Sequence, residues 1–287
     1  MRGDLKQRLK GKLTSEELEW LYKSYDIVGD VAIIRVPAPI KRHSETIAEA
    51  IMQTQKRVKA VWRQTSAVSG ELRLRELEWV AGERRIETTH KEFGCLFKVN
   101  LEECYFSPRL SHERMRIARQ VQPGEVVVNM FAGVGCYSII IAKHSQADKI
   151  YSIDLNPVAI RYMQENIKLN KLEKQVISIQ GDAEKIVKEK LRNVANRVLM
   201  PLPEKAYAYL NCAVLALKSE GGWVHYYDFE HAEKNENPVH KVKMKVSEKL
   251  QSLGVDFEIP FSRVVRTTGP NWYQIVLDLR ICSVNHL

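Results

Sequence analysis

The chain has 287 residues, of which 45% are hydrophobic and 28% charged, and it has no run near the roughly 20 apolar residues that a membrane-spanning helix needs. These values exclude a membrane or disordered protein and leave a globular chain with room for one large domain or two smaller ones. The net charge is +9 and the basic residues concentrate toward the front, which favours a polyanionic partner, because each lysine or arginine that neutralises a phosphate releases a counterion.

The cysteines and the amino-terminal sequence indicate the cellular compartment in which the protein is expected. Five cysteines are scattered with no C-x-x-C pair, a spacing that argues against a zinc site or a disulfide framework. Residues 1–13 lack the apolar core of a secretory signal. We therefore expect a cytoplasmic protein that uses no metal.

The first 108 residues predict a charged arm followed by a small domain. Residues 1–25 are expected to form the arm, with one short helix over residues 15–22. Residues 26–35 have the pattern of a strand interrupted at Gly29, and residues 40–58 have helical spacing. Four further strand-like runs follow at residues 60–63, 72–79, 86–90 and 95–99. Residues 26–108 therefore predict a small α+β domain, and the basic residues near the front of the chain favour a nucleic-acid partner for it.

From residue 109 onward, strands and helices alternate. Helices are expected over residues 110–121, 138–143, 157–169 and 204–218, and strands over residues 125–130, 149–153, 176–179, 197–200 and 223–227. Such alternation predicts a parallel sheet with helices on both faces. Residues 256–265 and 273–281 predict an antiparallel hairpin at the sheet edge. The fold expected for residues 109–287 is α/β, a doubly wound Rossmann-like sheet with an antiparallel C-terminal hairpin.

A glycine loop and two aspartates indicate a nucleotide site. In a doubly wound sheet the ligand lies beyond the carboxyl ends of the strands, and Gly133 and Gly135 follow the first of them. Asp154 and Asp182 end the next two strands, where a carboxylate can accept from ribose hydroxyls or the adenine amino group. A dinucleotide-binding loop would have a third glycine where this chain has Ser138. The pattern therefore favours S-adenosylmethionine, although each aspartate alone would also fit an ordinary turn.

Several longer motifs resemble one enzyme family. They are residues 105–114 (Tyr-Phe-Ser-Pro-Arg-Leu-Ser-His-Glu-Arg), 129–135 (Asn-Met-Phe-Ala-Gly-Val-Gly), 154–157 (Asp-Leu-Asn-Pro), 197–203 (Arg-Val-Leu-Met-Pro-Leu-Pro) and 225–227 (His-Tyr-Tyr). Together they are similar to the archaeal and eukaryotic tRNA (guanine-37-N1)-methyltransferases, from about residue 26 to the C-terminus. The resemblance implies a methyltransferase domain over residues 109–287 that transfers a methyl group from S-adenosylmethionine to N1 of guanosine 37. Its partner would be the anticodon stem-loop of tRNA, and we expect a monomer.

The resemblance also assigns catalytic roles. N1 of guanine carries a proton at neutral pH, so methylation needs a base, and Glu113 takes this role by its match to the family motif. Arg73 or Arg75 would stabilise the charge that develops on O6. Their alternation predicts that both lie on one face of a strand, and a phosphate-binding strand face is the competing interpretation.

Further residues would contact substrate or cofactor. Tyr105 would stack on a flipped guanine or lie buried in the core, and Arg109 would contact phosphate or pair with Glu113. The loop of residues 201–203 would lie against the base through Pro201, Leu202 and Pro203. The residues expected to hold the cofactor are Asn129, Phe131, Ala132, Gly133, Val134, Gly135, Asp154, Leu155, Asp182 and Ala183.

Two residues depart from the family pattern. Pro201 stands where the family usually has asparagine, and proline lacks the donor with which asparagine can bind a guanine edge. Asn129 stands where aspartate is common, which removes a negative charge beside the cofactor. Two alternatives stay open. One is a wyosine-pathway enzyme on the same nucleotide, which methylates a wyosine precursor or transfers an aminocarboxypropyl group. The other is a cofactor-binding RNA-binding protein without catalysis.

Overall fold

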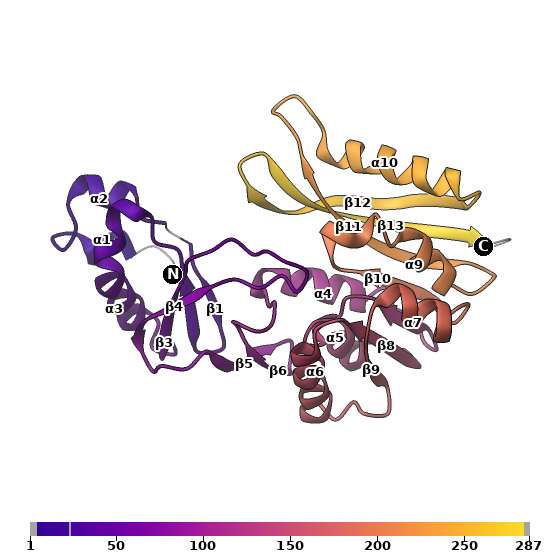
Figure 1. Ribbon diagram of the computed structural model, residues 1–287, viewed down its shortest axis with the longest axis horizontal. Coiled ribbons are helices and arrows are strands. Elements are labelled where there is room, and N and C mark those ends of the chain that lie inside the picture. Colours follow the sequence, from indigo (N-terminus) through magenta and orange to yellow (C-terminus); the bar gives the residue numbers. More distant parts are fainter. Residues whose placement is uncertain (1–4, 23, 284–287) are drawn as a thin grey trace. The chain divides into compact units, whose positions relative to one another are not determined.

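The computed structural model describes residues 5–22 and 24–283. The chain divides into two compact units, unit 1 (Met1–Ser111) and unit 2 (His112–Leu287), whose elements are labelled in Figure 1. Each unit has a sheet and a hydrophobic core of its own. None of the helices in the described part is long and apolar enough to cross a membrane.

Unit 1 contains a mixed four-stranded sheet and a separate hairpin. The sheet has the order β1 (Asp26–Val28), β2 (Val31–Ile34), β3 (Ala60–Gln64), β4 (Leu77–Gly82). β1 and β2 form an antiparallel hairpin, whereas β2 and β3 are parallel and are connected through η1 (Ala38–His43) and α3 (Ser44–Thr54). The hairpin of β5 (Glu87–Glu92) and β6 (Cys95–Asn100) follows, and then η2 (Pro108–Leu110). The predicted small α+β domain is confirmed.

Within the predicted arm of residues 1–25, the described residues 5–22, 24 and 25 contribute to the core of unit 1 and do not form a detached arm. They contain two short helices, α1 (Leu5–Leu9) and α2 (Ser15–Glu19). Three of their leucines are buried in one cluster with side chains of α3 and the sheet: Leu9, Leu13 and Leu21. The sequence does not indicate this burial, because the three leucines are separated by charged residues and form no apolar run.

The predicted strand over residues 72–79 is wrong in its first half. Residues 70–73 form a turn, closed by hydrogen bonds between the main chains of Ser69 and Leu74, and Arg73 has a φ of 55°. β4 begins only at Leu77. Arg73 and Arg75 therefore do not share one face of a strand.

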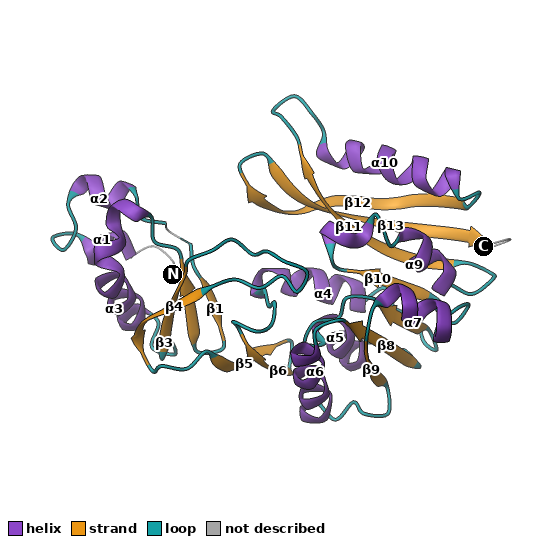
Figure 2. Ribbon diagram, viewed as in Figure 1, coloured by secondary structure: helices purple, strands orange, loops and turns teal. Residues whose placement is uncertain are grey.

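Unit 2 is built on a seven-stranded sheet (Figure 2). Its strands along the chain are β7 (Val126–Asn129), β8 (Lys149–Asp154), β9 (Val176–Gln180), β10 (Arg197–Met200), β11 (Gly222–His231), β12 (Asp256–Gly269) and β13 (Trp272–Ser283). Their order in space is β12-β13-β11-β10-β7-β8-β9. The strands from β11 to β9 are parallel, and the hairpin of β12 and β13 adds antiparallel to β11. The predicted doubly wound sheet and its C-terminal hairpin are confirmed.

Helices cover both faces of this sheet. One face carries α7 (Ala183–Lys190), α8 (Pro203–Ala206), α9 (Leu210–Ala216) and α10 (Pro238–Ser252), whose apolar residues share one core cluster. The other face carries α4 (Ser111–Ala118), α5 (Cys136–His144) and α6 (Pro157–Leu169). The sequence pattern predicts neither α7 nor α10, and the single helix expected over residues 204–218 is divided into α8 and α9.

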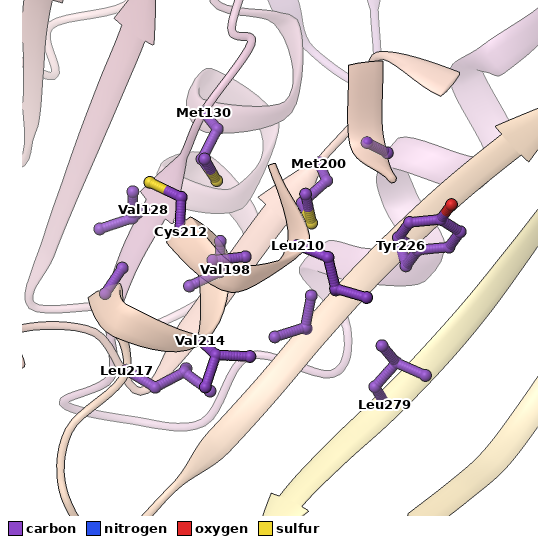
Figure 3. Close-up of a cluster of buried hydrophobic side chains, with 14 of the residues drawn as sticks. Val128, Met130, Val198, Met200, Leu210, Cys212, Val214, Leu217, Tyr226 and Leu279 are labelled. Atoms are coloured by element: carbon purple, nitrogen blue, oxygen red, sulfur yellow. The ribbon is translucent and has the colours of Figure 1, made fainter. Parts of the chain in front are cut away.

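One hydrophobic cluster of unit 2 lies between the sheet and α9. Val128, Val198 and Tyr226 come from three strands, and Leu210 and Val214 of α9 pack on them (Figure 3). All five side chains are fully buried. Because side chains alternate along a strand, the residue after Tyr226 faces the opposite side of the sheet, where α4 and α5 lie.

Gly221, immediately before β11, allows a test of this packing. It has a φ of 82°, and a Cβ there would lie 2.1 Å from the carbonyl oxygen of Ile281 on β13, whereas Gly124 has a φ of 78° with open space around it. We expect Gly124→Ala to lower the free energy of unfolding by about 1 kcal/mol, the cost of a left-handed alanine, and Gly221→Ala by at least about 3 kcal/mol. Urea denaturation measures both. Equal losses would contradict a rigid contact between Gly221 and β13.

Candidate active site

The sheet order brings the carboxyl ends of β10, β7, β8 and β9 side by side. Each strand is followed by a segment with candidate residues, namely 201–203, 130–135, 155–156 and 181–182. Two of these segments stay joined to a neighbouring strand, because the N–H of Ala132 donates to the carbonyl of Ile153 and that of Gly181 donates to the carbonyl of Asp154. The structure thus brings the candidate cofactor segments to one edge of the sheet.

The glycine loop is held against Asp154. Gly133 has a φ of 54°, and its N–H donates to Asp154 Oδ2 at 2.6 Å, while the N–H of Asn156 donates to Oδ1 at 2.9 Å. Gly135, with a φ of 91°, leads into α5, and a Cβ there would lie 2.9 Å from Cγ of Met163. Burial raises the pKa of the Asp154 carboxyl and outweighs the two N–H donors.

Asp182 caps α7 and is bound by a tyrosine. Its Oδ1 accepts the N–H of Lys185 at 3.0 Å, and its Oδ2 accepts the hydroxyl of Tyr209 at 2.6 Å. The Tyr209 ring packs edge-on against Phe131, with ring centroids 5.3 Å apart. Burial raises the pKa of Asp182, but the hydrogen bonds from Tyr209 and the α7 N-terminus outweigh it, so the pKa is lowered overall. Tyr209 therefore connects two residues predicted at different strand ends.

The acceptors at this edge fit a nucleoside cofactor. Ribose hydroxyls and an adenine amino group are hydrogen-bond donors, and Asp154 and Asp182 present carboxylates at the ends of adjacent strands. The side chain of Leu155 is 41% exposed, and with the ring of Phe131 it offers apolar surface beside these acceptors. The residues present are therefore compatible with S-adenosylmethionine.

Asn129 lies behind this edge, inside the domain. Its fully buried amide donates to Ser138 Oγ at 3.1 Å, and Ser138 also accepts from Ser152 at 2.7 Å. Among residues 5–22 and 24–283, its buried Oδ1 has no hydrogen-bond partner. Four other candidate cofactor residues are also buried: Ala132, Val134, Gly135 and Ala183. The structure places the side chain of Asn129 between β7, β8 and α5, where it contacts Ser138.

Glu113 is buried on α4, and hydrogen bonds surround its carboxylate. Only 2% of its side chain is exposed. Arg116, one helical turn further, donates from Nη2 to Oε1 at 2.7 Å and from Nε to Oε2 at 3.0 Å. The hydroxyl of Tyr227 donates to Oε1 at 2.8 Å, and Nη2 of Arg263 donates to Oε2. Burial raises the pKa of the Glu113 carboxyl, but Arg116, Arg263 and Tyr227 outweigh it and hold the pKa below its ordinary value.

A chain of buried polar contacts continues from Arg116 into the sheet. Both oxygens of Asp278 on β13 accept from Arg116, at 2.6 and 3.0 Å. Nδ1 of the fully buried His225 lies 2.7 Å from Asp278, and its Nε2 lies 2.6 Å from Nη1 of Arg197. An arginine can only donate, which assigns the imidazole proton to Nδ1, and burial lowers the pKa of His225 despite Asp278. The last contact of this series joins Arg197 to Glu125, where Nε donates to Oε2 at 2.7 Å.

Strand register explains why Glu113 lies at the same end of the sheet as the glycine loop. Met200, the last residue of β10, pairs with Tyr226, so Tyr227 is level with Pro201. The Tyr227 hydroxyl contacts Glu113 and also accepts from the hydroxyl of Tyr137 on α5, at 3.3 Å. In the segment after β10, Pro201 and Leu202 are half-buried and Pro203 is buried at the start of α8. The structure therefore brings Glu113, the helix after the glycine loop and residues 201–203 together.

Four candidate residues belong to unit 1. The guanidinium of Arg73 lies over the Tyr105 ring, 4.7 Å from its centroid. Burial lowers the pKa of Arg75, and the charges of Asp26 and Tyr105 partly oppose this effect. Nε of Arg109 donates to Asp26 Oδ1 at 2.6 Å. The alternative that Arg109 pairs with Glu113 is wrong, because Arg109 pairs with Asp26 inside unit 1.

Sequence reasoning misses the side chains that hold Glu113. Tyr227 belongs to a motif that carries the family resemblance, but the pattern assigns it no role. Arg263 lies 150 residues from Glu113, and Asp278 lies 162 residues from Arg116, so no local spacing connects them. The one available signal is Asp278 itself, a charged residue inside an otherwise apolar strand run.

Asp278→Asn tests the polar chain through stability. Removing the carboxylate takes one of the two buried carboxylate partners of Arg116 away, and we expect a loss of about 3 kcal/mol in the free energy of unfolding at neutral pH. Because its pKa is far below the ordinary value, Asp278 contributes its stability above pH about 4 and loses it as the pH falls further. The difference between parent and variant should therefore shrink in acid. Asp148→Asn, at an exposed position, is the control, and equal unfolding free energies in the two variants would contradict the role of Asp278.

Two family descriptions match the chain. The TRM5/TYW2 methyltransferase domain matches residues 88–254, and the TYW2 N-terminal domain matches residues 5–85. A tRNA (guanine(37)-N(1))-methyltransferase Trm5b of Pyrococcus abyssi is 40% identical over 262 residues, which cover 91% of this chain and 76% of the relative. A tRNA 4-demethylwyosine(37)-methyltransferase Taw21 of Saccharolobus solfataricus is 37% identical and covers 91% of this chain and 94% of its own length.

Solved structures agree with these matches. A complex of aTrm5 and tRNALeu has a TM-score of 0.82 at 37% identity and covers 98% of this chain and 79% of that chain. A Methanocaldococcus jannaschii TYW2 in complex with AdoMet has a TM-score of 0.65 at 29% identity and covers 91% of this chain and 100% of that chain. The methyltransferase match spans more than half of the chain, and the relatives align over most of their length. The chain therefore belongs to the TRM5/TYW2 methyltransferase family.

Proposed function

We propose that the protein is a tRNA methyltransferase that transfers a methyl group from S-adenosylmethionine to N1 of guanosine 37. The observation that carries this proposal is the Glu113 carboxylate, which is buried, kept ionised by Arg116 and Arg263, and situated at the sheet end that bears the glycine loop. Methylation of guanine N1 needs an acceptor for its proton. The name of a relative that is 40% identical describes this same reaction.

The strand ends of unit 2 hold the cofactor in this proposal. S-adenosylmethionine supplies an electrophilic methyl group on a sulfonium centre. Asp154 accepts from the ribose hydroxyls and Asp182 from the adenine amino group, while Gly133 and Gly135 allow the loop to approach closely. The AdoMet complex of a family member with 29% identity supports this assignment.

In this proposal Glu113 accepts the proton of guanine N1, and an arginine of unit 1 stabilises the negative charge on O6. Glu113 takes the N1 proton, and the electron pair of the broken N1–H bond forms the new bond to the methyl carbon. Negative charge that develops on O6 is stabilised by Arg73 or Arg75. Arg73 is the first choice, because its guanidinium lies over Tyr105, the ring proposed to stack on the flipped guanine.

Unit 1 is proposed to bind the anticodon stem-loop. The front part of the chain carries much of the basic charge, and a family neighbour was solved as a complex with tRNALeu. Arg109, half-exposed beside Asp26, is the residue of this group expected to reach phosphate. The protein acts as a cytoplasmic monomer in this proposal.

Action on a wyosine precursor is the second candidate. A relative named as a 4-demethylwyosine methyltransferase is 37% identical over most of both chains, and the first 85 residues match a TYW2 domain. Pro201 offers only a carbonyl to the base, where asparagine would offer a donor as well. A tricyclic wyosine precursor and guanosine present different hydrogen-bonding groups at the base edge. The loss of a donor at Pro201 is therefore the observation that favours the wyosine precursor as substrate.

Glu113→Gln tests the proposed base. The amide keeps the size of the side chain but cannot take a proton, so we expect the single-turnover rate on a tRNA transcript to fall by about 10²–10⁴. Nucleoside mass spectrometry measures 1-methylguanosine, and calorimetry checks that S-adenosylmethionine still binds. Glu184→Gln, at an exposed ion pair on α7, is the matched control.

Substrate variants separate the candidate functions. A transcript with adenosine at position 37 should be inert, and the mass of the transferred group distinguishes methyl from aminocarboxypropyl. Modification of a tRNA that carries the wyosine precursor, with none of the guanosine transcript, would favour the second candidate. An unchanged rate in Glu113→Gln would reject Glu113 as the base.

A further inference from the structure

Arg263 differs from the other two donors to Glu113 in its exposure. Its side chain is 41% exposed, compared with 18% for Arg116, while Tyr227 is 1% exposed. Arg263 belongs to β12, the edge strand of the sheet, whose register shifts on both sides of residues 261–264. Of the three donors to Glu113, Arg263 is therefore the one whose side chain lies toward solvent.

The three donors also differ in how firmly they are anchored. Arg116 is fixed by both oxygens of Asp278, and its guanidinium lies 4.6 Å from the ring centroid of Phe261. Tyr227 is fixed by the hydroxyl of Tyr137. Arg263 donates to Glu113 through Nη2, and its buried Nε has no hydrogen-bond partner in the described part of the chain. Arg263 is thus the donor that can leave at the lowest cost.

The carboxylate offers no further position for a proton donor. A carboxylate has about four lone-pair positions, two on each oxygen. Arg116 and Tyr227 take those of Oε1, and Arg116 and Arg263 take those of Oε2. A guanine N1–H can therefore reach Glu113 only at the position that Arg263 holds.

We propose that Arg263 covers the proton-accepting oxygen of Glu113 in the free protein and leaves it when the target base enters. The inference rests on the proposed function, since it takes Glu113 as the proton acceptor. Arg263 acts through Glu113 and is thus a positioning residue. While it is bound it keeps the carboxylate ionised, and its departure both frees Oε2 and removes a neighbouring positive charge.

The charged and titratable groups around Glu113 determine the sign of the expected effect. They come from α4, α5, β11, β12 and β13: Arg114, Arg116, Tyr137, His225, Tyr227, Arg263 and Asp278. Of the positive charges that contact the carboxylate, Arg263→Met removes one and leaves Arg116 in place. An opposite charge at contact lowers a carboxyl pKa by about 1–3 units, so its loss should raise the pKa of Glu113 by at least about one unit.

Carbon-13 NMR of the glutamate carboxyl groups tests the contact in the free protein. The Glu113 signal is assigned by its loss in Glu113→Gln and is titrated in the parent, Arg263→Met, Arg263→Lys and Arg266→Met. We expect the pKa of Glu113 to rise in Arg263→Met and to be partly restored in Arg263→Lys. Arg266→Met is the control on the same strand, because Arg266 donates to Gln274 at 2.7 Å. An equal pKa in parent and Arg263→Met would overturn the inference.

The pH profile of methylation, measured as kcat/KM at subsaturating tRNA and as the rate at saturating tRNA, tests the departure of Arg263. Because kcat/KM reports the free protein, the acid limb of kcat/KM for Arg263→Met should move up by about one pH unit. At saturating tRNA, parent and variant should instead share one acid limb, since Arg263 has left the carboxylate in both. On the alkaline plateau its rate should equal or exceed that of the parent, because Oε2 is already open. A merely structural or RNA-binding role would instead lower kcat/KM on the plateau and leave the acid limb in place, which would overturn the inference.

The outcomes separate this inference from the proposed function. Full activity of Glu113→Gln would reject the base and with it the role of Arg263. Inactivity of Glu113→Gln together with a parent-like pH profile of Arg263→Met would reject only the role of Arg263. Thermal melting confirms that each variant is folded.

Discussion

The buried pair of Glu113 and Arg116 is the constraint on which the rest of the site depends. A carboxylate that is 2% exposed is costly unless every lone pair is satisfied and its charge is balanced. Arg116 balances it, but Arg116 needs the second carboxylate of Asp278, which in turn needs His225 and Arg197. The position of one side chain on α4 is therefore determined by strands from the far end of the sequence. The C-terminal hairpin, which lies at the edge of the sheet, is in this sense part of the candidate active site.

The sheet separates the two halves of the proposed chemistry. Acceptors for a nucleoside follow β8 and β9, whereas the acceptor for a proton is held by β11, β12 and β13. Tyr227 joins the halves, because its hydroxyl contacts both Glu113 and Tyr137 on the helix after the glycine loop. The methyl donor and the proton acceptor must both reach N1, because the electron pair that the proton leaves behind forms the bond to the methyl carbon. A parallel sheet that ends in an antiparallel hairpin brings the residues proposed for both tasks to one edge.

Alternation and turn residues in the sequence predict most of unit 2, because its strands are apolar runs separated by clear turns. They do not predict α7 and α10, whose helical faces are dominated by lysine and glutamate in the sequence. The turn at residues 70–73 is missed because leucine and arginine alternate there as in a strand, although Gly70 and Arg73 take positive φ. The glycine loop and Asp154 are accessible to motif reasoning, since they are local in sequence. Arg263 and Asp278 are not, because only the folded sheet brings them to α4.

A carboxylate that two guanidinium groups contact is ionised but is a weak base. This weak basicity must be explained if Glu113 is to accept the N1 proton. Proton transfer is most effective when the pKa of the base lies near the working pH, whereas Arg116 and Arg263 hold the pKa of Glu113 below its ordinary value. When the entering guanine displaces Arg263 and excludes water, the effect of burial on the pKa of Glu113 is no longer opposed by Arg263. The carboxylate then becomes more basic at the moment the N1 proton reaches it. The free protein would keep Glu113 charged and solvated by its own arginines, and the substrate itself would raise its basicity. Removal of one labile ion pair thus reconciles the lowered pKa of the free carboxyl with its use as a proton acceptor.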